Sequence, residues 1–190
     1  MTRAESVRVA QPLFQEAGGG SIPTSALDLW FMTATAGTVI ELNRLWHSRL
    51  PKVVKSNIQR CSHKAFFVAE HGGLYYASAI WTNPVARGLP SDTWLELRRF
   101  AIAPDHPKNT ASRMLGWMAR EVKRMFPVLE KAVSYQDMDV HTGTIYRAAG
   151  WTPTTIAEAS YGNHHQWSNK KRKRAKGQSD SPKQRWEKVL

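Results

Sequence analysis

The sequence predicts an α/β domain with a mixed (α+β) sheet. Three observations lead to this prediction: a hairpin pattern over residues 64–81, a long alternating segment over residues 94–103, and an amphipathic segment over residues 110–126. Alternation of apolar and polar residues is typical of half-buried strands, whereas apolar residues spaced three and four apart are typical of helices. Because the two patterns interleave along the chain, we expect helices that pack on a sheet.

The first third of the chain is predicted to be helical. Residues 4–17 mix apolar and polar positions and end at a run of three glycines, and residues 22–46 form an apolar-rich segment that Gly37 divides. Pro51 ends or kinks the second piece, because proline lacks the N–H that a helix interior needs. Residues 52–60 are expected to add a short basic helical turn.

The middle of the chain has the patterns of strands. Residues 64–70 (KAFFVAE) and residues 74–81 (LYYASAIW) are predicted to pair as a hairpin, because the turn between them contains two glycines. A loop rich in proline and glycine follows. Residues 94–103 (WLELRRFAIA) then alternate over enough length to form a long strand.

Residues 110–126 form the clearest predicted helix. Asn109 or Thr110 is a suitable N-cap residue, and Pro127 ends the helix. One face of the helix is apolar at helical spacing and carries Met114, Leu115, Met118, Val122 and Met125.

The chain is then predicted to return to the sheet. Residues 131–136 should form a strand and residues 142–149 a short helix, which Gly150 closes because glycine favours the left-handed conformation beyond a helix end. Residues 151–160 are expected to form the last strand of the domain.

Basic residues are concentrated at the C-terminal end. The chain has 27 Lys and Arg against 15 Asp and Glu, a net charge of +12, and residues 168–190 account for +7 of it. Because this segment has few apolar residues, we predict a folded domain over residues 1–167 and a disordered basic arm over residues 168–190. Such an arm either keeps a protein in solution or contacts the phosphates of a nucleic acid.

The composition excludes several classes of protein. A hydrophobic content of 42% and eight Trp exclude a wholly disordered chain. No stretch approaches the roughly 18 apolar residues of a membrane span, and the N-terminal residues lack the apolar run of a secretory signal. Cys61 is the only cysteine, which indicates no internal disulfide and a reducing, cytoplasmic location. The basic arm has no apolar face, so no membrane partner is expected.

Two segments carry candidate chemistry. In residues 108–113 (KNTASR), free backbone N–H groups and the positive end of the helix dipole would bind a phosphate, and Arg113 adds charge. On this loop alone, a simple helix cap is an equally good interpretation. The second segment, residues 141–151 (HTGTIYRAAGW), is a short helix that ends in Tyr-x-x-x-Gly-aromatic.

Together the two segments resemble the GNAT family of N-acyltransferases. In that family a long strand, a turn and an amphipathic helix hold the coenzyme A pyrophosphate. A later helix ends in a pattern like Ile-Tyr-x-x-x-Gly-aromatic, which here is formed by Ile145, Tyr146, Gly150 and Trp151. The resemblance implies acetyl-CoA or a related acyl-CoA as donor, with Tyr146 as general acid to the coenzyme A thiolate. The glycine-rich turn of the family is absent, and residues 108–113 stand in its place. The implied cofactor-binding residues are Phe100, Ile102, Lys108, Asn109, Thr110, Ala111, Ser112 and Arg113.

Three blocks narrow the resemblance to the Mom-type DNA-adenine modification proteins of bacteriophages. They are residues 43–51 (NRLWHSRLP), residues 95–118 and residues 134–151, which agree in order and spacing. The resemblance implies conversion of adenine in double-stranded DNA to an N6-carbamoylmethyl (acetamido) derivative, which shields phage DNA from host restriction in the host cytoplasm. The target base would be swung out of the duplex into the pocket.

Transfer to the adenine amine needs proton removal or a strongly activated donor, because the nitrogen lone pair is delocalised into the ring. The resemblance implies His47 as a base or metal ligand. Asp137 lies at the carboxyl end of a predicted strand, where α/β sites are commonly built. The residues alone also fit a packed or capping role for His47, a helix N-cap role for Asp137 and a core role for Tyr146.

The sequence leaves open the roles of several charged residues and of several possible metal ligands. Arg98 and Arg99 are neighbours on a strand, so one should face the site while the other pairs with an acid such as Glu96. The single Cys-x-His of Cys61 and His63 is a weak metal signal. His141, His164 and His165 leave a metal site open. An iron-dependent step is also left open, because the transferred group is not a simple acetyl. The expected DNA-binding residues are Arg49, Lys52, Lys55, Lys170, Lys171, Arg172, Lys173 and Arg174.

Two other functions fit the sequence. One is an ordinary acetyl-CoA-dependent N-acetyltransferase that acts on a protein or a small amine. The other is a DNA-binding module that keeps the fold without catalytic activity.

Overall fold

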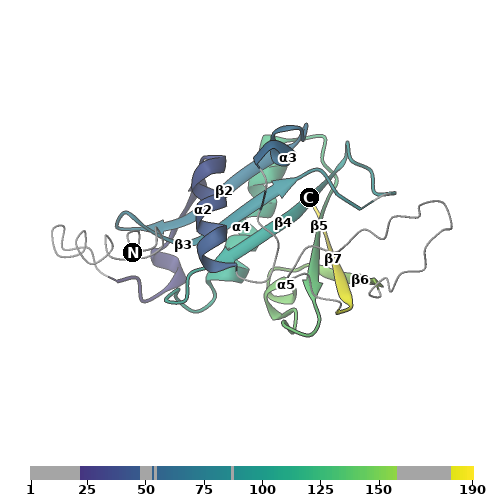
Figure 1. Cartoon of the computed structure of the whole chain (residues 1–190). Helices are drawn as coiled ribbons and strands as arrows, with labels where there is room; N and C mark the ends of the chain where they lie inside the picture. Colours follow the sequence, from purple (N-terminus) through teal and green to yellow (C-terminus); the bar gives the residue numbers. More distant parts are fainter. Residues whose placement is uncertain (1–21, 48–52, 54, 87, 158–180) are drawn as a thin grey trace, which may run out of the picture.

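The order of helices and strands is seen in a computed structural model that describes residues 22–47, 53, 55–86, 88–157 and 181–190 (Figure 1). In chain order the elements are η1 (Ala26–Asp28), β1 (Trp30–Thr33), α2 (Ala36–Trp46), α3 (Lys55–Gln59), β2 (Lys64–His71), β3 (Leu74–Thr82), β4 (Trp94–Ile102), α4 (Thr110–Met125), β5 (Lys131–Asp137), α5 (Thr144–Ala148), β6 (Thr152–Ala157) and β7 (Lys183–Val189).

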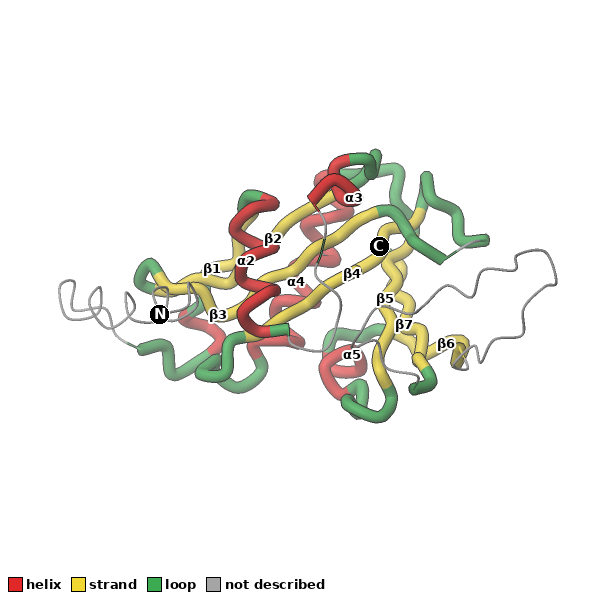
Figure 2. Tube along the Cα trace, viewed as in Figure 1, coloured by secondary structure: helices red, strands yellow, loops and turns green. Residues whose placement is uncertain are grey.

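The described strands form one mixed sheet of seven in the order β1-β2-β3-β4-β5-β7-β6 (Figure 2). All neighbouring strands pair antiparallel except β4 and β5, which are parallel. Parallel neighbours need a crossover connection, and here α4 supplies it. The predicted α/β class with a mixed sheet is confirmed.

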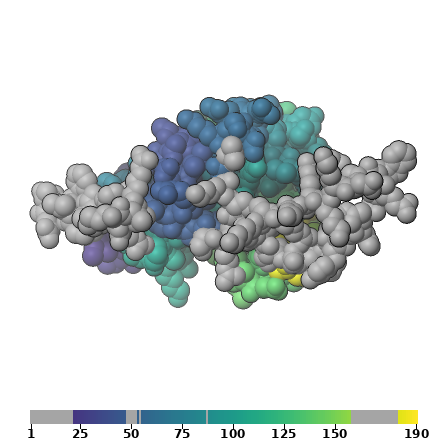
Figure 3. Space-filling view, viewed as in Figure 1, coloured from purple at the N-terminus to yellow at the C-terminus, as the bar shows by residue number. Residues whose placement is uncertain are grey.

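Helices cover both faces of the sheet. In Figure 1, α2 lies in front of the sheet and α4 behind it. Figure 3 shows α2 and α3 side by side on the front face. The apolar face predicted for α4 is buried, and Met114, Leu115 and Met118 are fully buried in the main core with Trp81. Burial of each such side chain contributes roughly 1.5–3 kcal/mol, so α4 anchors its face of the sheet.

A smaller core lies under α2 on the other face. Val39 and Leu42 of the helix pack there against Val68 and Ile80 of the sheet. Asn43 is buried with them, and its Nδ2 donates to the Ser78 hydroxyl at 2.9 Å. This packing holds α2 against the sheet. No described helix is long and apolar enough to cross a membrane.

Strand β4 contains a bulge that separates it from β5. Ile80 of β3 pairs with Arg99, but Trp81 pairs with Leu97, so Arg98 is the extra residue. Within the described strands, β4 and β5 pair from Trp94↔Lys131 only as far as Leu97↔Ser134, although both continue beyond it. A bulge bends a strand and increases its twist, which accounts for the divergence.

Most predicted elements are confirmed. The hairpin, the long strand, the amphipathic helix and the short helix form near the predicted bounds. So do the strands predicted over residues 131–136 and 151–160. Residues 4–17 lie outside the described residues. In the N-terminal segment the helix over residues 22–46 is only partly correct, because Trp30–Thr33 form strand β1 instead. These residues pair with β2, and Phe31 packs against the ring of Trp117 at 5.7 Å.

The predicted basic arm is wrong for its last residues. Lys183–Val189 form β7, which lies between β5 and β6 inside the sheet. Trp186 points into the core at 1% exposure, and on the other face Lys183 pairs with Asp137. Cross-strand partners of opposite charge therefore make a basic segment compatible with a strand. Residues 158–180, with Lys170–Arg174, lie outside the described residues.

We predict that the C-terminal strand is essential for stability. Trp186→Ala should lower the free energy of unfolding by about 3–5 kcal/mol, because it leaves a cavity in the main core. Val189→Ala on the same strand should change it by less than about 0.5 kcal/mol, because Val189 is 75% exposed. Urea unfolding of both variants measures the difference, and equal values would contradict a core role for β7.

Candidate active site

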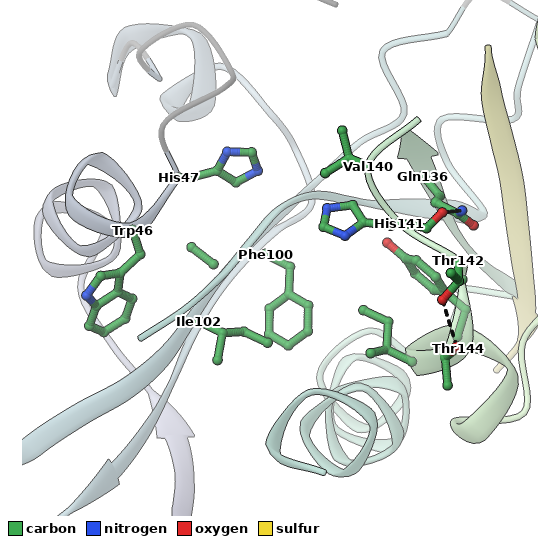
Figure 4. A pocket seen from close by; sticks show the side chains of 13 residues that line it. Trp46, His47, Phe100, Ile102, Gln136, Val140, His141, Thr142 and Thr144 are labelled. Carbon is green, nitrogen blue, oxygen red and sulfur yellow. Dashed lines mark hydrogen bonds between the residues drawn. The ribbon is translucent and has the colours of Figure 1, made fainter. Parts of the chain in front are cut away.

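A cavity of about 400 Å³ opens where β4 and β5 diverge (Figure 4). Its volume lies within the range of about 300–1,000 Å³ that is usual for small-molecule sites. It is lined by Trp46, His47, Phe100, Ala101, Ile102, Gln136, Val140, His141, Thr142, Gly143, Thr144, Ile145 and Tyr146. The walls thus come from the end of α2, from β4, from β5 and from the segment that includes α5.

The cavity brings together four of the residues that the sequence singled out as catalytic or cofactor-binding. His47 and Tyr146 line it, and so do Phe100 and Ile102 of β4. Residues far apart in the sequence meet here because the bulge in β4 opens the sheet at this point.

His47 is held at the end of α2 and faces the cavity. Its backbone N–H donates to the Asn43 carbonyl at 2.8 Å, so the capping interaction uses the backbone and leaves the ring available. Burial lowers the pKa of the imidazole below its usual 6.5, and the charges of Arg99 and His141 lower it further. His47 is therefore neutral at pH 7 and can accept a proton.

Tyr146 lies at the apex of the gap between the two strands. Its hydroxyl hydrogen-bonds the Ser134 hydroxyl at 2.9 Å, and Ser134 belongs to the last β4–β5 pair before the strands part. The ring stacks on Trp186 with centroids 5.3 Å apart and meets Trp151 edge-on at 5.6 Å. Burial raises the pKa of the phenol above 10, so Tyr146 stays protonated at neutral pH and can donate a proton.

Asp137 does not line the cavity. It ends β5, as predicted, but its carboxylate pairs with Lys183 Nζ at 2.5 Å and accepts a hydrogen bond from the Ser181 hydroxyl. It also accepts from the backbone N–H of Asp139 at 3.2 Å. The structure thus ties Asp137 to the C-terminal strand instead of bringing it to His47 and Tyr146.

The turn before α4 has a conformation that suits an anion. Asn109 has φ 68° and ψ 5°, a left-handed conformation in which asparagine replaces glycine more readily than other residues. Asn109 is the N-cap residue of α4, as predicted, but its side chain makes no capping hydrogen bond to the first N–H groups. The Thr110 hydroxyl donates back to the Pro107 carbonyl at 2.7 Å. With no acidic residue in its first turn, the 16-residue helix fits a bound phosphate.

Arg113 is engaged away from this turn. Its guanidinium donates to the carbonyls of Ala26 and Leu29 and lies over the ring of Phe31 at 5.1 Å. These contacts fasten η1 and β1 to α4. Lys108 and Ser112, by contrast, are exposed or partly exposed at the start of the helix.

Arg99 and Glu96 occupy the α2 face of β4. Arg99 pairs with Ile80, which belongs to the core under α2, and its Nη1 donates to the Arg98 carbonyl at 2.7 Å. Glu96 is buried and accepts from the backbone N–H of Val85 at 2.8 Å. Burial raises the pKa of the Glu96 carboxyl. Of the two neighbours Arg98 and Arg99, Arg99 is the one whose charge lowers the pKa of His47.

The remaining predicted residues divide between described and undescribed parts of the chain. Lys55 begins α3 and is exposed. Arg49, Lys52, Lys170–Arg174, His164 and His165 lie outside the described residues. In the part that the structure describes, no three His, Cys, Asp or Glu side chains group as metal ligands. Cys61 Sγ donates to the Asn57 carbonyl, and the ring of His63 packs edge-on against Phe126.

Trp46 and Gln136 line the cavity, although the sequence singled out neither as a site residue. Trp46 directly precedes His47, and Gln136 directly precedes Asp137. Neither residue type signals a site by itself, so only adjacency to a chosen residue could have indicated them. The sequence did not single out Gly143 either. Its φ of 74° is a conformation in which a residue with a side chain would be strained.

Comparison with solved structures defines the class of fold. An acetyltransferase of the GNAT family from Elizabethkingia anophelis, solved with acetyl-CoA, is 16% identical with a TM-score of 0.56, covering 86% of this chain and 99% of its own. A Bacillus subtilis acetyltransferase in complex with CoA is 12% identical with a TM-score of 0.57, covering 85% and 97%. The ribosomal-protein-alanine N-acetyltransferase from Brucella melitensis is 12% identical with a TM-score of 0.61, covering 85% and 99%. The chain has the GNAT acetyltransferase fold.

The sequence then assigns the family. Residues 68–189 match the Mom protein family, so this chain belongs to that family. The match extends to the end of β7, which agrees with the place of that strand inside the sheet. No curated protein matched the sequence.

We predict that Asn109 is needed for its backbone conformation. Asn109→Val should lower the free energy of unfolding by about 1–2 kcal/mol, because a β-branched residue is strained at this φ. Asn109→Gly should leave it nearly unchanged. Lys108→Val is the matched control, since Asn109 is the only described non-glycine residue with positive φ. Urea unfolding tests this, and equal stability of the valine and glycine variants at position 109 would contradict it.

Proposed function

We propose that this protein is a phage DNA modification enzyme that uses a coenzyme A-linked donor to convert adenine in double-stranded DNA to an N6-carbamoylmethyl (acetamido) derivative. Such a product would protect the DNA from host restriction, in the host cytoplasm. The observation that carries the proposal is one cavity that holds a neutral His47 and a protonated Tyr146, in a chain of the Mom family.

The residues at the cavity fit a coenzyme A-linked donor. The residues from Lys108 to Ser112, which lead into the first turn of α4, would hold the pyrophosphate, and Phe100 and Ile102 would pack along the arm that leads to the cavity. When bound, the coenzyme would supply a thiolate leaving group. For an N6-carbamoylmethyl product, the N6–CH2 bond would form as the bond from that CH2 to the coenzyme A sulfur breaks, because acyl transfer from a thioester would give an N6-acyl amide instead. GNAT proteins with acetyl-CoA and with CoA bound support this part of the proposal.

His47 and Tyr146 have complementary roles in this proposal. His47, neutral at pH 7, removes a proton from the adenine amine and so restores the nucleophilicity that ring delocalisation takes away. Tyr146 donates its proton to the departing thiolate, and the Ser134 hydroxyl at 2.9 Å is placed to hydrogen-bond the phenol oxygen as it loses the proton. Asp137 has an indirect role in this proposal: its ion pair with Lys183 would hold the end of β5, where the segment that leads to His141 begins.

Double-stranded DNA must present its base in an extruded form. A cavity of about 400 Å³ admits one base and not a duplex, so the adenine would leave the stack. Lys55, exposed on α3, would contact the DNA backbone, and Arg49 and Lys52, which lie outside the described residues, are proposed to do the same.

The basic segment Lys170–Arg174 is proposed to bind DNA phosphates as well. The strands on either side of this segment, β6 and β7, pair at Ala157↔Lys183, and Lys183 pairs with Asp137 at the end of β5. Lysine and arginine there would bind phosphates by releasing counterions, without reading the sequence.

An ordinary N-acetyltransferase is the second candidate. The GNAT fold favours it, because solved proteins with this fold include enzymes that acetylate a ribosomal protein. It predicts acetyl-CoA turnover with a protein or small amine and no change in the mass of DNA. A DNA-binding module without activity predicts neither acetyl-CoA turnover nor a change in the mass of DNA.

We predict a modified deoxyadenosine in DNA from cells that express the protein. Digestion to nucleosides and mass spectrometry should detect it. His47→Gln and Tyr146→Phe should each lower its yield by about 10²-fold or more, because each removes a proton-transfer group. His106→Gln and Tyr75→Phe are the controls, since both residues lie outside the cavity lining. Soluble, folded wild-type protein with no modified deoxyadenosine would end the proposal.

We also predict a pH dependence set by His47. Activity should fall as the imidazole becomes protonated, at a pH below 6.5, because burial and then Arg99 lower its pKa. Arg99→Gln removes one of the charges that lower the pKa, so the acid limb of kcat/KM should move to higher pH. Arg98→Gln should leave the limb in place, because Arg98 is not among the groups that shift His47. A limb that stays fixed in Arg99→Gln would contradict this role of His47.

A further inference from the structure

One wall of the cavity is the segment 138–143, which joins β5 to α5 and contains Val140 and His141. The backbone N–H groups of these two residues donate to the Asp137 carbonyl at 3.3 and 3.0 Å. These bonds turn the segment on itself. They do not hold it against the rest of the sheet, so other contacts must set the position of this wall.

The side chain of Gln136 connects the wall to the C-terminal strand. Its Nε2 donates to the carbonyl of His141, and its Oε1 accepts from Trp186 Nε1 at 2.7 Å. An indole N–H can only donate, so the amide oxygen must face Trp186 and the amide nitrogen must face His141. Gln136 is 6% exposed, and Trp186 is 1% exposed. A buried amide with both ends bonded fixes the distance between its partners.

Trp186 also contacts Tyr146, one of the two proton-transfer candidates. Its indole stacks on the ring of Tyr146 with an interplanar angle of 12°. The guanidinium of Arg147, the residue after Tyr146, lies over the same indole at 5.4 Å. One side chain of β7 therefore touches both Gln136, which holds His141, and the helix that presents Tyr146.

Gly143 provides independent support for this arrangement. It has a φ of 74°, and a Cβ at this position would lie 2.5 Å from Gln136 Oε1 and 2.5 Å from Trp186 Cζ2. Only glycine allows the segment to close this tightly on the two side chains. The beginning of the segment is tied to the same strand region, because the backbone N–H of Met138 donates to the Pro182 carbonyl at 3.1 Å.

We propose that Gln136 and Trp186 are positioning residues, which hold His141 and Tyr146 in the arrangement that the transfer reaction needs. The claim about catalysis rests on the proposed function, whereas the claim about the wall does not. Figure 4 shows Gln136 beside the segment of His141 and Thr142, with His47 on the far side of the cavity. If the bridge is lost, the wall that faces His47 moves.

The test uses two substitutions at Gln136 in the full chain. Gln136→Glu keeps an acceptor for the Trp186 N–H but loses the donor to the His141 carbonyl, and Gln136→Met loses both. The matched controls are Gln184→Glu and Gln184→Met. Gln184 is the register partner of Gln136 on β7, and its amide donates to the Arg185 carbonyl at 2.9 Å, outside the cavity lining.

Two measurements follow each variant. Hydrogen exchange of the amides in residues 138–143 should be about tenfold faster or more in both Gln136 variants, and unchanged in the β2–β3 hairpin. The kcat for DNA modification should fall by about 10²-fold with little change in the KM for DNA, because the reacting groups are misplaced while the DNA contacts remain. The Gln184 variants should match wild type in both measurements.

The outcomes separate the two claims. Gln136→Glu that folds and matches wild type in exchange and in kcat would overturn the inference. A wild-type protein that makes no modified deoxyadenosine would overturn the proposed function, and exchange alone would then decide whether Gln136 holds the wall. If Gln136→Met fails to fold, Gln136→Glu carries the test, because it keeps the bond to Trp186. A change of equal size in the Gln184 variants would also overturn the inference.

Discussion

The divergence of β4 from β5 is the feature on which the candidate site depends. A sheet has no interior cavity while every strand is paired, because neighbouring backbones lie too close for a ligand. Here one extra residue, Arg98, bends β4, and the pairing with β5 ends at Leu97↔Ser134. The gap that results is lined by β4 on one side and by Gln136 on the other. The same point places the Tyr146 hydroxyl beside Ser134, at the apex of the gap.

The chemistry of the cavity follows from two opposite effects of one environment. Burial disfavours the charged form of each group, so it lowers the pKa of His47 and raises that of Tyr146. The first group becomes a neutral acceptor and the second a protonated donor at the same pH. Such a separation of two titratable groups is a common basis for acid and base roles in one site. Arg99 strengthens the effect on His47, since its guanidinium lies on the same face of the sheet.

The C-terminal strand links the stability of the domain to this site. Trp186 fills the core behind Tyr146, and Lys183 neutralises Asp137 at the end of β5. Charges that would keep this segment in solvent are instead matched across the sheet, as in the pair of Lys131 with Glu187 at 3.1 Å. A strand of this kind is stable only when its partners are already in place. The family match extends through residue 189, the end of this strand.

The sequence by itself determined the α/β class, most of the helices and strands, and the resemblance to Mom-type proteins, because these depend on local periodicity and on short blocks of residues. It also indicated His47 and Tyr146. It did not indicate β1 or β7, because short or charged strands form only through pairing with distant partners. The tertiary structure alone decided that His47 and Tyr146 share a cavity, that Asp137 and Arg113 are engaged elsewhere, and that Gln136 bridges His141 and Trp186. These contacts join residues far apart in the chain, and no local pattern of residues specifies them.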